Sequence, residues 1–107
     1  MIEIKKRESG KYSFDLKTQG GHTLLKSVDF TDQQEAQKIV KSLNQVRPNG
    51  IRFERKTNHD GKFLFNLKNS KGKLIGQSLL YNSEAGMENG ITNLENTITS
   101  LANLGEL

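Results

Sequence analysis

The sequence repeats itself once with a shift of 51 residues, and this repetition restricts the possible folds more than any other feature. The stretch GKYSFDLKTQGGHTL at residues 10–24 has a near copy, GKFLFNLKNSKGKLI, at residues 61–75. Two copies are too few for a solenoid, which needs at least three. We therefore expect one domain, residues 1–107, made of repeat one at 1–47 and repeat two at 51–104, with a linker at 48–50.

Each repeat shows the pattern of three strands followed by one helix. Apolar residues alternate with polar ones around Phe14 and again around Phe65, which is typical of half-buried strands. Apolar residues then recur at helical spacing within 31–46 and from Ser83 onward. The sequence thus predicts an α+β fold of two tandem β-β-β-α repeats with an antiparallel sheet, pseudo-twofold symmetry and both helices on one sheet face. It does not say which strands of the two repeats meet.

The small size of each repeat makes the two halves dependent on each other. A unit of about fifty residues is close to the lower limit for folding without disulfides or metals. The chain has no cysteine, so neither a disulfide nor a thiolate–zinc site can stabilise one half alone. The absence of cysteine suits a reducing cytosol. No signal peptide or membrane span is recognisable, so we expect a cytoplasmic protein.

Glycine accounts for the strongest identities between the repeats. A turn that closes with a residue at positive φ favours glycine, which has no Cβ to clash. We assign this structural role to the glycines at the ends of the first and second turn of each repeat: Gly10, Gly21, Gly61 and Gly72. A phosphate-binding loop would need G-x-x-x-x-G-K-[ST], which does not occur.

Two further glycines, Gly86 and Gly90, lie one turn apart inside the second predicted helix. Each should cost about 1 kcal/mol relative to alanine. We expect a strand or the other helix to pack closely against them. The alternative is that Gly86 lies in a frayed first turn and that Gly90 tolerates solvent.

No residue pattern indicates catalysis, a metal or a cofactor. His22 and His59 fall in predicted turns and have no neighbour at metal-ligand spacing. Repeat one has Glu8 in place of His59, so the repeat does not require the histidine. Glu3 and Glu54 are shared carboxylates, which could act as acid and base or, more ordinarily, pair with a lysine of the neighbouring strand, Lys17 or Lys68. We expect no enzyme.

Lysines are the one group that suggests a binding surface. Residues 1–81 hold sixteen Lys and Arg against eight acids, a net charge of +8, whereas residues 82–107 hold four Glu and no base. Alternation places six lysines on the sheet face opposite the aromatic residues, where they could bind a polyanion: Lys5, Lys11, Lys17, Lys56, Lys62 and Lys68. However, single-strand binders interleave basic and aromatic residues, and surface lysines also protect strands from aggregation. Leu64 would also stand on this lysine face, exposed unless the back of the sheet is covered, which hints at self-association or at a sheet that curls over itself.

The stretch FERKTNHDGKFLFNLKNSKGKLIGQSLLYNSEAGMENGITNLENTI at 53–98 resembles the repeat of the YegP-like bacterial family of unknown function. The first repeat is similar to it more loosely, with DQQEAQKIV where the second has SEAGMENGI. The resemblance implies a small cytosolic α+β protein built by duplication, without an established activity or assigned site residues. We therefore favour a non-enzymatic binding or accessory module, either protein-binding or self-associating. The alternative is nucleic-acid binding through the lysine-rich sheet face.

Overall fold

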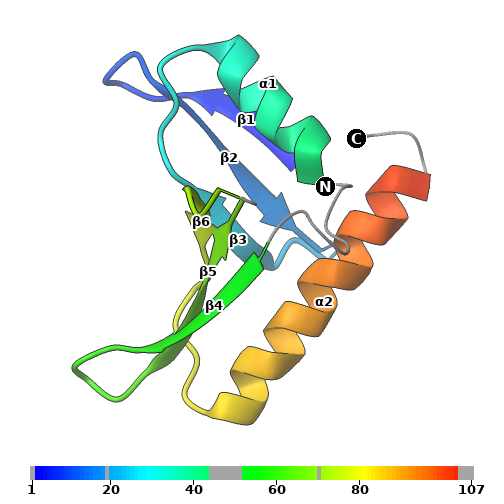
Figure 1. Ribbon diagram of the computed structural model, residues 1–107. Coiled ribbons are helices and arrows are strands. Elements are labelled where there is room, and N and C mark those ends of the chain that lie inside the picture. Colours follow the sequence, from blue (N-terminus) through cyan, green and yellow to red (C-terminus); the bar gives the residue numbers. More distant parts are fainter. Residues whose placement is uncertain (1, 19, 44–51, 70, 104–107) are drawn as a thin grey trace.

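The computed structural model describes residues 2–18, 20–43, 52–69 and 71–103, and the predicted linker at 48–50 lies outside these ranges. Three strands and a helix are followed by three more strands and a longer helix (Figure 1). In chain order these elements are β1 (Ile2–Lys6), β2 (Tyr12–Lys17), β3 (Thr23–Ser27), α1 (Gln33–Ser42), β4 (Arg52–Thr57), β5 (Phe63–Lys68), β6 (Leu74–Gln77) and α2 (Glu84–Asn103). None of the helices in the described part is long and apolar enough to cross a membrane.

All six strands form one antiparallel sheet in the order β1-β2-β3-β6-β5-β4. The two halves of the chain therefore meet at β3 and β6, where Lys26 is opposite Gln77 and Ser27 is opposite Gly76. One more backbone hydrogen bond, from the Val28 N–H to the Ile75 carbonyl at 2.9 Å, extends this junction. The α+β class and the antiparallel sheet are confirmed, and the structure supplies the pairing that the sequence left open.

Local backbone features recur in both halves with the 51-residue shift. The four repeat glycines have φ between 77° and 87°, as the turn pattern predicts. The Ser27 hydroxyl accepts from the Phe14 N–H at 2.8 Å, and the Ser78 hydroxyl accepts from the Phe65 N–H at 3.0 Å. The strand register shifts after Leu16 and again after Leu67. The same side-chain chemistry at matching positions thus produces the same local geometry.

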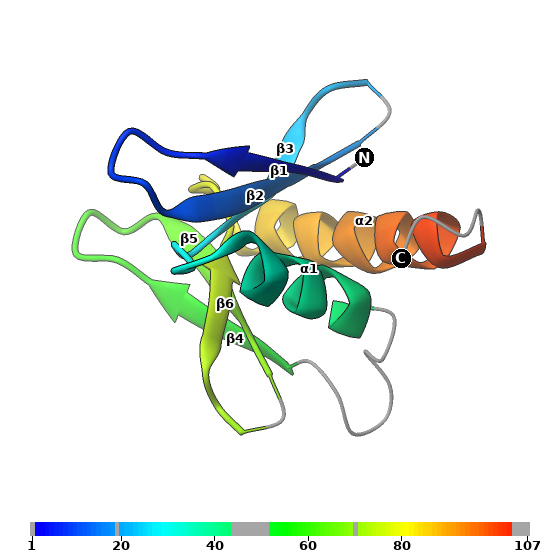
Figure 2. The ribbon, with the colours of Figure 1, turned by 90° about the horizontal axis from the view of Figure 1, so that it is seen from above.

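Both helices pack on one face of the sheet, which we call the inner face (Figure 2). Their apolar residues join the alternating strand residues in a single core. The Phe14 ring stacks on Phe30 at 6.1 Å, and the Phe65 ring stacks on Tyr81 at 6.4 Å. Side chains at the start of each helix cap it: Asp32 Oδ1 accepts from the Glu35 N–H at 2.7 Å, and Ser83 Oγ accepts from the Gly86 N–H at 3.0 Å.

Tyr81 explains why helix α2 carries a glycine at position 90. A Cβ on Gly90 would lie 2.3 Å from the Tyr81 hydroxyl oxygen, so only glycine leaves room for the ring. A Cβ on Gly86 would lie 3.7 Å from the nearest ring atom, which is ordinary contact. Close packing is therefore the correct interpretation for Gly90, although the packed group is an aromatic side chain and not a strand or helix backbone.

Candidate functional site

The sheet face opposite the helices, which we call the outer face, carries a row of six polar residues with one residue from each strand. Residues directly opposite each other in a sheet share a face, and the neighbours of Asp15 in β2, Phe14 and Leu16, point into the core. From β1 to β4 this polar row consists of Glu3, Asp15, Lys26, Gln77, Asn66 and Glu54. The outer face is therefore the first candidate for a binding site.

In the second half of the molecule, the polar row forms a closed network around Glu54. Its carboxylate accepts from Lys68 Nζ at 2.8 Å and from Asn66 Nδ2 at 3.2 Å, and Lys56 Nζ lies at 3.4 Å. Asn66 is buried and accepts in turn from Gln77 Nε2 at 3.0 Å. The hydrogen bond from Lys68, followed by the one from Asn66, lowers the pKa of Glu54 from 4.5 to about 2.

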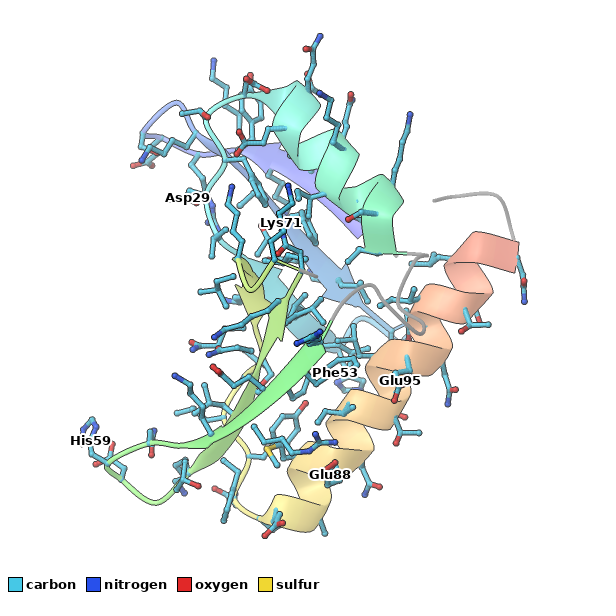
Figure 3. All side chains as sticks on the ribbon, in the orientation of Figure 1. Asp29, Phe53, His59, Lys71, Glu88 and Glu95 are labelled. Carbon is cyan, nitrogen blue, oxygen red and sulfur yellow. The ribbon has the colours of Figure 1, made fainter. Side chains whose placement is uncertain are left out.

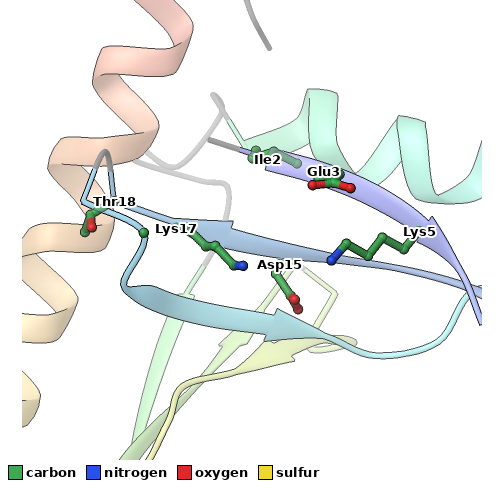
Figure 4. A pocket seen from close by; sticks show the side chains of 7 residues that line it. Ile2, Glu3, Lys5, Asp15, Lys17 and Thr18 are labelled. Atoms are coloured by element: carbon green, nitrogen blue, oxygen red, sulfur yellow. The ribbon is translucent and has the colours of Figure 1, made fainter.

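In the first half, the corresponding residues surround a pocket. Glu3, Lys5, Asp15 and Lys17 occupy the places that Glu54, Lys56, Asn66 and Lys68 have in the second half. Among the described residues, no hydrogen bond or ion pair joins the side chain of Glu3, Lys5 or Asp15 to a partner. These side chains instead line a hollow of about 440 Å³, at which Lys5, Lys17 and Asp15 lie side by side (Figure 4).

The six lysines proposed from the sequence do not form one continuous basic surface. Lys56 and Lys68 pair with Glu54, and Lys62 Nζ donates to Asn82 Oδ1 at 2.6 Å. Lys5 and Lys17 line the pocket together with two carboxylates, whereas Lys11 is exposed just before β2. The acids of the polar row thus lie between the lysines and offset much of their charge.

A second hollow, of about 540 Å³, lies on the outer face where β3 meets β6. Leu79 and Leu80, which follow β6, line it and are 44% and 57% exposed. Val28, Leu74 and Lys26 also line this hollow, which we call the junction hollow. Among the described residues, Leu79 and Leu80 are the large apolar side chains that are exposed. Leu64 is only 6% exposed, so the expectation of an exposed Leu64 on an uncovered sheet is wrong.

The two halves differ chemically beside the junction hollow. In the first half, the Arg7 Nε donates to the Ser13 hydroxyl at 2.7 Å and lies 4.0 Å from Asp29. In the second half, Leu64 stands in the place of Ser13 and Leu80 in the place of Asp29. Two members of a polar cluster in one half are thus leucines in the other, a difference that a comparison of the two repeats can reveal.

His59 is exposed and does not join a group of side chains suited to catalysis. His59 lies at the tip of the turn between β4 and β5, with its side chain 91% exposed, far from Glu88 and Glu95 on α2 (Figure 3). Its Nε2 is 3.7 Å from Asp60 Oδ1. Within the described residues, no group of three or more His, Cys, Asp or Glu side chains could hold a metal ion.

Sequence reasoning missed the ion pair that joins α2 to the edge strand β4. The Arg55 guanidinium donates to both carboxylate oxygens of Glu88, with Nη2 to Oε2 at 3.1 Å. This contact lowers the pKa of Glu88 and raises that of Arg55. Repeat one has Ile4 and Gln37 at these positions, so the comparison of repeats gives no signal for it.

This chain is similar in sequence to a known family model and to proteins of similar length. A family model described as a domain of unknown function (DUF1508) matches residues 58–100. The UPF0339 protein YegP of Escherichia coli (strain K12) is 35% identical over 99 residues, which cover 92% of this chain and 90% of that protein.

Two solved structures share the fold. The solution NMR structure of yegP from E. coli superposes with a TM-score of 0.82 at 32% identity, covering 92% of this chain and 84% of the other. The solution NMR structure of a UPF0339 protein from Shewanella oneidensis gives 0.80 at 26% identity, with 89% and 80% covered. The chain therefore belongs to the YegP-like UPF0339 family, which contains the DUF1508 domain.

Proposed function

We propose that this protein is a non-enzymatic binding module that docks a partner protein at the junction hollow. The observation that carries the proposal is the pair of exposed leucines, Leu79 and Leu80, beside a hollow of about 540 Å³ on a sheet face that the two helices leave uncovered. Leucines that remain about half exposed gain from being covered, by about 2 kcal/mol for the two together. Exposed apolar groups rimmed by polar residues mark interaction sites more often than chance placement does.

The charge around the hollow favours an acidic partner. Lys26 lines the hollow, and no described residue forms an ion pair with it. Residues 1–81 carry a net charge of +8, which would attract an acidic protein before contact. The partner that fits is therefore a protein segment with one or two apolar side chains flanked by Asp or Glu.

A capture experiment with matched variants tests this proposal. The tagged protein would be mixed with nuclease-treated cell lysate, and a captured partner would then be titrated against purified variants. Leu80→Asp gives the second half the residue that the first half has at Asp29, and we expect it to weaken binding at least about tenfold, equivalent to about 1.4 kcal/mol. Lys56→Gln is the control on the same face, away from the residues that line the hollow, and should leave the affinity unchanged.

Two outcomes would contradict this docking surface. If Leu80→Asp binds the partner as tightly as the wild type, the junction hollow is not the contact. If sedimentation of the wild type shows a dimer that Leu80→Asp dissociates, the hollow is covered by a second copy and not by another protein.

Nucleic-acid binding is the second candidate, supported by the basic charge of residues 1–81. The ion pairs of Lys56 and Lys68 and the inward position of the aromatic rings speak against it. Measuring RNA and DNA binding at increasing salt concentration distinguishes a nucleic acid from a protein partner. Binding that falls steeply with salt and is abolished by Lys62→Glu and Lys68→Glu would favour nucleic acid over a protein partner.

We also propose that the two halves arose by duplication of one β-β-β-α unit and that the molecule retains pseudo-twofold symmetry. The recurrence of turns, serine bridges and bulges at a shift of 51 residues supports this origin. Equivalent positions should then respond alike, and Phe14→Ala and Phe65→Ala should each cost about 3–5 kcal/mol of unfolding free energy. Clearly unequal losses in urea unfolding would argue against equivalence. A cytoplasmic location and the absence of catalysis remain part of this proposal.

A further inference from the structure

We propose that the edge strand β1 pairs with β1 of a second copy of this protein, so that the two sheets join into one. The two strands would run antiparallel and be centred on Ile4. Among the described strands, β1 forms one margin of the sheet and pairs with β2 alone. Figure 2 shows β1 at the front of the sheet, with neither helix lying across it. No residue of β1 lines the junction hollow, so this inference does not rest on the docking surface.

The backbone pattern determines which groups of β1 are free to pair. Tyr12 exchanges both of its backbone hydrogen bonds with Phe30, at 2.8 and 2.7 Å, and therefore forms none with Lys6, its opposite residue in β1. In an antiparallel ladder, hydrogen-bonded pairs alternate with pairs that are not hydrogen-bonded. The residues of β1 whose N–H and C=O groups point away from the sheet are then Ile2, Ile4 and Lys6.

A second copy centred on Ile4 would satisfy these backbone groups and would match charge as well. Ile4 would lie opposite Ile4 of the second copy, and Ile2 opposite Lys6, each as a hydrogen-bonded pair. Glu3 would lie opposite Lys5 of the second copy in a pair without hydrogen bonds, where side chains approach most closely. The twofold axis repeats this contact, and opposite charges at such positions stabilise strand pairing.

The charges that would meet are not engaged elsewhere. Among the described residues, no ion pair joins Glu3 or Lys5 to another side chain, whereas in the other half Lys56 lies 3.4 Å from Glu54. Within its own sheet Glu3 lies opposite Asp15, which is unfavourable for two carboxylates. The ammonium group of Lys5 from the second copy would stand beside these carboxylates and offset their repulsion.

The opposite edge strand, β4, lacks this complementarity. Repeat two has Arg55 where β1 has Ile4, so the same pairing would place two arginines directly opposite each other. Arg55 also donates to Glu88, and Glu54 already accepts from Lys68. β1 is therefore the edge that favours a second copy, and a twofold contact through one edge closes the assembly at a dimer.

The test is sedimentation of the untagged full chain from micromolar to millimolar concentration at low salt. We expect a reversible dimer that persists in Leu80→Asp. Glu3→Lys and Lys5→Glu each place like charges opposite each other and should each weaken dimerisation at least about tenfold, because both symmetric contacts change at once. An equimolar mixture of these two variants restores the opposite charges and should dimerise about as tightly as the wild type. Lys11→Glu makes the same charge change outside β1 and is the matched control, which should dimerise like the wild type.

Backbone amide signals give a second measurement and report the folding of each variant. As the concentration rises, the amide signals of Ile4 and Lys6 should shift and exchange more slowly with solvent, because these N–H groups become hydrogen-bonded. A wild type that stays monomeric at millimolar concentration, or assemblies larger than a dimer, would overturn the proposal. So would a dimer that Leu80→Asp dissociates, a mixture of folded Glu3→Lys and Lys5→Glu that does not associate, or an equal loss in Lys11→Glu.

Discussion

Replacing Gly90 by alanine tests the close contact between Tyr81 and helix α2. A Cβ at this position would lie 2.3 Å from the Tyr81 hydroxyl oxygen and 2.6 Å from its Cζ, so the ring must move. The ring stacks on Phe65 and cannot move without losing that contact. Overpacking of this kind costs about 1–3 kcal/mol, whereas alanine gains about 1 kcal/mol over glycine in a helix. We expect a net loss of up to about 2 kcal/mol.

Gly86→Ala is the matched control on the same helix. Its Cβ would meet the Ser83 hydroxyl at 3.1 Å and no ring atom closer than 3.7 Å, so the helix-propensity gain should largely remain. Urea unfolding followed by circular dichroism measures the free energy of unfolding of both variants. Unchanged m-values would show that the substitutions alter stability and not the surface exposed on unfolding. Tyr81→Phe in the Gly90→Ala background should recover part of the loss by removing the nearest atom. If Gly90→Ala stabilises the protein as much as Gly86→Ala, the proposed packing is wrong.

Three further predictions concern the sheet. Gly76→Ala should cost at least about 1–3 kcal/mol in urea unfolding, because its Cβ would lie 2.7 Å from the carbonyl oxygen of Lys26, a backbone atom that cannot turn aside; wild-type stability would contradict this. Ser78→Ala leaves the buried N–H of Phe65 without its acceptor and should cost about 1–3 kcal/mol, whereas a change near zero would show that another acceptor takes over. Glu54 stabilises the fold at any pH above its ordinary pKa of 4.5, and this stabilisation should be lost as the pH falls toward its folded-state pKa of about 2. Acid unfolding of Glu54→Gln should lack that part of the pH dependence, and an unchanged acid transition would contradict the assigned pKa.

Much of the fold could be predicted because its determinants are local. The alternation around Phe14 and Phe65 locates β2 and β5, and glycine at the turn ends predicts the positive φ that the structure shows. The cap at Asp32 follows in the same way from residues close in sequence. Each of these features depends on a few neighbouring residues, whose preferences are visible without the rest of the chain.

The remaining features depend on which distant residues meet. Pairing of β3 with β6 is a contact between the halves, and neither strand carries a pattern that selects the other. The pair of Glu54 with Lys68 on the neighbouring strand is confirmed as the sequence predicted, whereas the proximity of Lys56 to the same carboxylate was not predicted; both contacts weaken the predicted polyanion face. The burial of Leu64 on the outer face also depends on neighbours across the sheet and not on its own strand.

The short ladder at β3 and β6 has a consequence for how this protein associates at high concentration. Only two opposed residue pairs join these strands among the described residues, Lys26 with Gln77 and Ser27 with Gly76. If the halves part transiently, β3 of one molecule can pair with β6 of another and restore every contact in an intertwined dimer. Refolding from concentrated denatured protein is therefore the condition under which exchanged dimers should accumulate, and dilution before refolding should prevent them.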